Sequence, residues 1–137
     1  MSRGIGAYAK KIVEDDETVI FEYGGYNLNE PEYRNENYVL DGMITIQKSC
    51  FVEPEIHKKL KKMPSGWKKL MTKRIPVSVD YTQLLKDGKI IIENCSFCWN
   101  ITDDELKADM MACHILFKLF YQYQEEGSIP SVISYNV

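Results

Sequence analysis

The feature that most restricts the fold is a long helical pattern near the C-terminus, over about residues 103–126. It opens on Thr102-Asp103-Asp104-Glu105, in which a hydroxyl and carboxylates can accept hydrogen bonds from the free N–H groups of a first helical turn. Gly127 and Pro130 follow as a C-terminal stop. Apolar residues recur on one stripe, which we expect to face the core: Leu106, Met110, Cys113, Phe117 and Phe120.

Shorter segments before and after this helix alternate in the manner of strands. The pattern predicts strands over residues 7–14, 18–23, 40–46, 75–79, 90–92 and 132–135, and short helices over 53–63 and 80–86. This order favours an α+β fold. We expect a mainly antiparallel sheet of about five to six strands, with the long helix and one or two short helices packed on one face.

Length and composition indicate one globular domain over residues 1–137. The hydrophobic content of 45% and the charged content of 27% are those of an ordinary folded domain. No apolar run reaches the roughly 18–20 residues that span a bilayer, and the first residues lack the apolar core of a secretory signal. We therefore expect a cytoplasmic protein that has no membrane contact.

The charge is unevenly distributed along the chain. Residues 57–79 contain eight Lys and Arg and no acid, whereas both flanking regions are acidic. Such a cluster can attract phosphates, and an aromatic ring within it can stack or bind cations. This predicts an RNA- or nucleotide-binding alternative that uses Trp67, Lys68, Lys69, Lys73 and Arg74. The competing interpretation is a solvated helix followed by a lysine-rich edge strand that resists aggregation. A third is that the basic segment pairs with the acidic flanks of this chain or of a neighbour.

The polar stretch Gly24–Tyr38 is the preferred recognition surface. A loop of about 15 residues without regular structure is uncommon unless it is functional or disordered. Tyr rings supply contact area and Asn amides supply adaptable hydrogen bonds. The candidate binding residues are Tyr26, Asn27, Asn29, Tyr33, Arg34 and Tyr38. The alternative is that these tyrosines pack the loop onto its own domain.

No catalytic motif is present, and the metal-binding pattern is weak. Cys95 and Cys98 have the spacing of a chelating or redox pair, but a structural zinc site needs a second ligand pair. We expect reduced, metal-free structural thiols and no cofactor. His57 and His114 have no neighbour at a diagnostic spacing. Asp109 falls on the apolar side of the long helix, where a carboxylate must be paired or protonated.

Met111 and Ile115 project from the side of the helix that the pattern otherwise marks as polar. Either a further packing layer covers them, or they contact a second subunit. The leading hypothesis is a noncatalytic binding protein that self-associates or binds a protein partner through the 24–38 loop. Binding of RNA or a phosphorylated ligand is the alternative, and an enzyme or zinc protein is least favoured.

Overall fold

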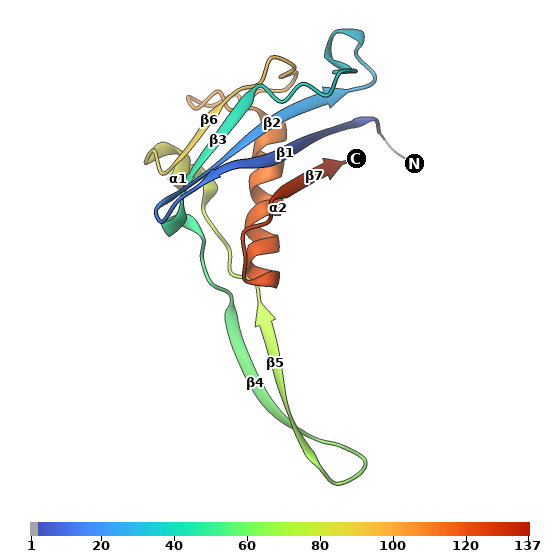
Figure 1. The fold of residues 1–137 in the computed structure, drawn as a ribbon, viewed down its shortest axis with the longest axis vertical. Helices are drawn as coiled ribbons and strands as arrows, with labels where there is room; N and C mark the ends of the chain where they lie inside the picture. The colour runs from blue at the N-terminus through green and yellow to red at the C-terminus, as the bar shows by residue number, and fades with distance from the viewer. Residues whose placement is uncertain (1–2) are drawn as a thin grey trace.

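A five-stranded antiparallel sheet with a long helix on one face forms the body of the molecule (Figure 1). The computed structural model describes residues 3–137, and these confirm the α+β fold class. The strands lie in the order β6-β3-β2-β1-β7, with bounds Ile90–Glu93, Gly42–Gln47, Thr18–Asn27, Ile5–Glu14 and Val132–Asn136. Short helical turns connect them: η1 (Pro31–Tyr33), η2 (Lys48–Cys50) and α1 (Tyr81–Lys86).

The helix α2 (Met110–Glu126) covers the sheet face on which the strands place their apolar residues. Alternate residues of the central strands are fully buried against it, including Ala7, Ala9, Val19, Phe21, Tyr23, Ile44 and Ile46. The intervening residues of the same strands point to the opposite face. No helix of residues 3–137 covers that face (Figure 1). The sheet therefore has one dry face and one open face.

The helix is rotated from the orientation that the sequence predicts. Its buried side consists of Met111, Ala112, Ile115, Leu116, Leu119, Phe120 and Gln124, while Phe117 is exposed. Both stripes of the helix are apolar, so periodicity alone does not distinguish them. Gly25 of β2 lies beneath the Met111 side of the helix, since a Cβ atom built at Gly25 would be in ordinary van der Waals contact with Met111, at 3.8 Å. The helix thus approaches the sheet along its Met111 side.

The helix also begins later than predicted, at Met110 instead of residue 103. Thr102 donates its hydroxyl to Asp104 and forms a local turn, and Lys107 has a positive φ of 49° that interrupts any helix. Asp109 is the true N-cap, and its carboxylate accepts the N–H of Met111 at 2.9 Å. The predicted end is confirmed, since Gly127 adopts the left-handed conformation and donates its N–H to Tyr123.

The helix predicted over residues 53–63 is wrong. Residues Glu55–Lys62 form β4, which pairs with β5 (Lys68–Ile75) in a separate two-stranded sheet. The strand predicted over 75–79 is also wrong, because Ile75 is the last residue of β5 and residues 76–79 have no regular structure. Positions four apart lie on one side in both a helix and a strand, so Ile56 and Leu60 fit either structure.

Candidate functional site

The hairpin β4–β5 projects from the body as a slender arm, residues 55–75 (Figure 1). Its strand residues are exposed on both faces, except for the half-buried Ile75 at its root. The arm contains eight Lys and Arg and one acid, Glu55, whereas the other 116 residues contain nine basic and nineteen acidic residues. A strongly cationic arm therefore extends from an acidic body.

The register of the arm sets lysines directly opposite one another. Lys61 pairs with Lys69 and Lys62 pairs with Lys68, so like charges share a face at closest approach. Such pairs are destabilising, and a two-stranded hairpin is marginal in water to begin with. The ion pairs of the described residues do not relieve this repulsion, because they are Lys11–Glu14, Lys48–Glu14, His57–Glu55 and Lys86–Glu105.

The tip of the arm is apolar. Gly66 has a positive φ of 87° and donates its N–H to Met63, and Met63 donates to the carbonyl of Trp67 at 2.6 Å, which closes the turn. Trp67 is 77% exposed and Pro64 is also exposed. An indole ring in water beside lysines is available for stacking.

Both legs of the arm are tied to the C-terminal end of α2. Gln124 is buried, and its amide accepts the N–H of Val77 at 2.6 Å and donates to the Val77 carbonyl at 2.9 Å. Tyr123 donates its hydroxyl to Glu53 at 2.5 Å, ahead of β4. Arg74 donates to the carbonyl of Glu125 at 3.4 Å, at the negative end of the helix dipole. Arg74 is therefore a root contact, unlike the free lysines further out.

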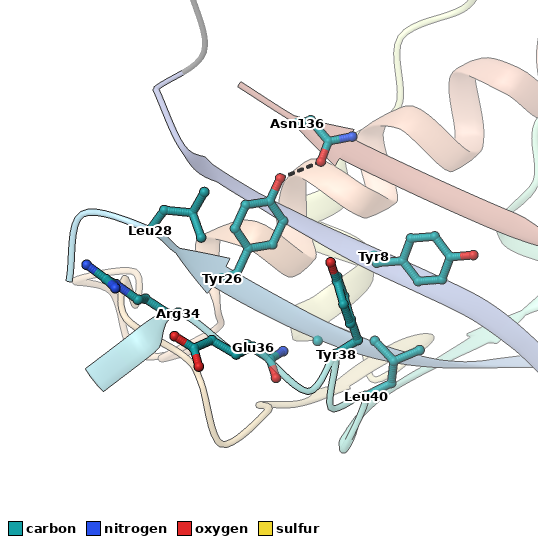
Figure 2. Close-up of a pocket in the computed structure, with 10 residues that line it drawn as sticks. Tyr8, Tyr26, Leu28, Arg34, Glu36, Tyr38, Leu40 and Asn136 are labelled. Atoms are coloured by element: carbon teal, nitrogen blue, oxygen red, sulfur yellow. Dashed lines mark hydrogen bonds between the residues drawn. The ribbon is translucent and has the colours of Figure 1, made fainter. Parts of the chain in front are cut away.

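A second candidate site is a pocket of about 650 Å³ on the open face of the sheet (Figure 2). Its lining is mostly apolar and aromatic: Tyr8, Gly24, Tyr26, Leu28, Arg34, Asn35, Glu36, Tyr38, Leu40 and Asn136. Tyr26 donates its hydroxyl to Asn136 at 2.5 Å, and burial raises the pKa of this phenol above its ordinary value. The volume and the few polar groups are those of a small-molecule site.

The loop that borders the pocket is held in one shape. The buried side chain of Asn35 donates to the carbonyls of Gly25 and Val39 and accepts the Val39 N–H at 2.8 Å. Asn35 and Tyr38 both have positive φ, 49° and 53°, and Tyr38 is 86% exposed. An unfavourable backbone held by three hydrogen bonds presents an aromatic ring to solvent.

The structure brings only part of the predicted recognition set together. Tyr26, Arg34 and Tyr38 line the pocket. Asn27 accepts the backbone N–H of Asn29, and Asn29 in turn donates to the carbonyl of Arg3 at 2.7 Å. Tyr33 is half-buried in η1 and is not a lining residue. Sequence reasoning missed Tyr8 and Asn136, because they reach the pocket from β1 and β7.

Cys95 and Cys98 lie near the buried carboxylate of Asp109. Asp109 is 0% exposed and accepts the Tyr23 hydroxyl at 2.9 Å and the Cys95 thiol at 3.5 Å. Burial, reinforced by the charge of Asp109, raises the pKa of Cys98 to about 12, and burial raises that of Cys95 to about 11. All four cysteines are free, and the described residues contain no group of three or more His, Cys, Asp or Glu placed to hold a metal. Asp109 acts here as a satisfied helix cap.

Met111 and Ile115, expected on a second layer or a second subunit, are buried against the chain's own sheet. They are not on the surface, so they are not available to another subunit in this fold. His114 is stacked on Tyr135, with ring centroids 4.4 Å apart, and His57 contacts Glu55 at 3.2 Å on the arm.

Comparisons with known proteins give no relative. No protein-family model, no curated protein and no solved structure matches this chain. Among residues 3–137, no helix is long and apolar enough to cross a membrane.

Proposed function

We propose that this chain is a noncatalytic binding protein whose arm binds the phosphate backbone of nucleic acid. The observation that supports this proposal is the charge of the arm, which presents seven lysines that have no carboxylate partner. The lysines would displace the cations that condense on the phosphates of a nucleic acid, and the phosphates would relieve the repulsion across the Lys61–Lys69 and Lys62–Lys68 pairs.

The density of charge supports a polymer over a single phosphate group. Eight paired residues at about 3.3 Å each give an arm of about 26 Å. A nucleic-acid duplex carries about 15 phosphates over that length, at one per 1.7 Å. The arm's cations would neutralise about half of them. A lysine-rich edge that only resists aggregation needs far fewer charges and has no use for an exposed Trp67.

Fluorescence anisotropy of labelled 20-mer nucleic acid across a salt series tests the proposal. The slope of log affinity against log salt should fall by up to about 3.6 when Lys61, Lys62, Lys68 and Lys69 are all changed to Gln. The matched control changes four body lysines, Lys10, Lys86, Lys89 and Lys107, to Gln and should leave the slope unchanged. Absence of binding at low salt, or equal losses in both variants, would reject the proposal.

A second candidate function is the binding of a small molecule in the 650 Å³ pocket, whose bordering loop is fixed by the hydrogen bonds of Asn35. Its aromatic walls suit a planar aromatic molecule, and Arg34 offers a cation to an anionic group of such a ligand, in a pocket that Glu36 also lines. Anilinonaphthalene sulfonate is a suitable fluorescent probe, and Tyr38→Ala or Arg34→Gln should weaken its binding. Tyr121→Ala removes an exposed tyrosine that does not line this pocket and should have no effect. Equal probe binding by all variants would exclude the pocket.

A further inference from the structure

We infer that the arm lies in a groove of B-form duplex DNA, with little preference for sequence, and that Trp67 contacts the bases at its tip. This inference rests on the proposed function, and it names the form of nucleic acid and the mode of contact.

The shape of the arm favours a groove over a flat surface. Two paired strands form a ribbon with a strand separation of about 4.8 Å. The major groove of B-form DNA is about 12 Å wide and admits such a ribbon, whereas the deep, narrow major groove of duplex RNA does not. The arm projects clear of the body, so its full length can enter (Figure 1).

The distribution of charge points the same way. Residues opposite each other in an antiparallel pair share a face, so one face carries Lys58, Lys62, Lys68 and Arg74. The other face carries an equal number of cations: Lys59, Lys61, Lys69 and Lys73. A ribbon that lies on a flat polyanion uses one face only. Within a groove, phosphates line both walls, and both faces find partners at once.

The choice of cation indicates recognition without sequence reading. Seven of the eight cations are Lys, which bind phosphate as point charges, whereas specific base contacts in the major groove are most often bidentate and from Arg. The arm's one arginine, Arg74, is at the root and is directed to the carbonyl of Glu125. The acidic body would be repelled by DNA, which confines contact to the arm.

The tip supplies the remaining contact. Trp67 and Pro64 are exposed at the turn, with Lys62 and Lys68 paired just behind them. An apolar side chain that is carried into the major groove can contact base edges, such as the methyl group of thymine. The inference therefore predicts that Trp67 leaves water when DNA binds, which a purely electrostatic contact would not require.

The first test follows Trp67 directly. Trp99→Phe leaves Trp67 as the one tryptophan, since the chain contains two. This variant is titrated at 100 mM salt with a mixed-sequence 20-bp DNA duplex, its single strand, the duplex RNA of the same sequence, and heparin. The DNA duplex should bind tightest and change Trp67 emission, while heparin should bind without that change. Trp67→Ala should weaken binding to the DNA duplex by about 10-fold or more and leave heparin binding unchanged.

The second test separates a groove from a flat surface with two matched triples. Lys58, Lys62 and Lys68 are changed to Gln on one face, and Lys59, Lys61 and Lys69 on the other. If the arm lies in a groove, each triple substitution should lower the slope of log affinity against log salt by about 2.7. If the arm lies on a flat surface, one of the two triple substitutions should leave this slope unchanged. Circular dichroism checks that the strands persist in both, which is expected because each variant reduces repulsion.

The outcomes distinguish this inference from the proposed function. Absence of binding to every polyanion rejects both. Tighter binding to the single strand or to duplex RNA, an unchanged Trp67 emission, or one silent triple rejects the groove and leaves nucleic-acid binding in place. Duplex DNA preference with an emission change and equal losses in both triples supports it.

Discussion

The body and the arm of this protein are ordered by different physical means. In the body, the sheet and α2 bury a shared apolar core, and the side chains of Phe21, Tyr23 and Phe120 are almost completely removed from water. In the arm, every strand residue but one is exposed, and backbone hydrogen bonds alone join two like-charged strands. The body therefore has a hydrophobic core of its own. The arm has no such core, and an anionic partner would stabilise it by relieving the repulsion between its lysines.

The two candidate sites differ in the same way. The pocket is preorganised, since Asn35 fixes its loop through three hydrogen bonds before any ligand arrives. The arm is fixed at its root by Gln124 and Tyr123 and has no tertiary support further out. A preorganised pocket favours one small ligand, whereas a projecting cationic ribbon favours a long, uniform one.

Shortening the arm should have the largest effect on binding. Residues 59–71 are replaced by Asn-Gly, a two-residue hairpin turn that joins Lys58 to its cross-strand partner Thr72. The replacement removes five lysines and Trp67, so affinity for the DNA duplex at 100 mM salt should fall by about 1000-fold or more. The thermal midpoint should barely change. A large loss of stability would show that the arm supports the body after all.

Two side-chain truncations, one in the body and one in the arm, should differ in their effect on the free energy of unfolding. Phe120→Ala removes a ring that is 1% exposed and contacts Phe51 and Tyr81, and it should lower the free energy of unfolding by about 3–5 kcal/mol. Leu60→Ala, at a position 62% exposed on the arm, should change it by less than about 0.5 kcal/mol. Urea denaturation followed by circular dichroism measures both. Comparable losses would contradict the separation of the two regions.

The parts of the fold that the sequence predicts are those where one period dominates. The hairpin of residues 7–23, the strands 40–46 and 90–92 and the end of the long helix are confirmed within a few residues. The arm was mistaken for a helix followed by an edge strand, because Ile56 and Leu60 fit both periods. The feature that distinguishes a hairpin from a helix here is the turn over Met63–Trp67, which joins the two strands. The prediction interpreted the Pro-Ser-Gly core of this turn as the end of a helix.

The sites were predictable by composition and not by geometry. Charge counting found the basic segment, and the Tyr and Asn content found the loop. No local pattern shows that Tyr8 and Asn136 approach the loop across the sheet, or that Gln124 holds Val77, because these contacts span long stretches of chain. Met111 and Ile115 were misplaced because the helix has two apolar stripes, and periodicity alone does not show which of them faces the sheet.

Thiol reactivity should also separate the regions. The raised pKa values of Cys95 and Cys98, about 11 and 12 against an ordinary 9.0, keep both protonated at pH 8. Ser65→Cys places a thiol at the exposed tip of the cationic arm, and this thiol should react with Ellman's reagent about 100-fold faster than Cys95 and Cys98 do.

The raised pKa values of these two thiols also predict how stability depends on pH. Below about pH 9 the thiols are protonated in both the folded and the unfolded chain, and their contribution to stability is complete. As the pH rises, unfolded thiols ionise first, so this contribution should be lost up to about pH 11–12.

The smallest expected effect concerns the joint between body and arm. Gln124→Leu keeps the buried apolar stem and leaves the N–H and carbonyl of Val77 without their partner, which should cost about 1–2 kcal/mol. Hydrogen exchange should quicken at residues 75–79 while the amides of β1 and β2 stay protected, because the core is unaltered. The control is Gln122→Leu, two residues earlier on the same helix, with an expected change below about 0.5 kcal/mol. Faster exchange throughout the sheet would mean that Gln124 supports the body itself, and unchanged exchange at Val77 would mean that the root is held by Tyr123 and Arg74 alone.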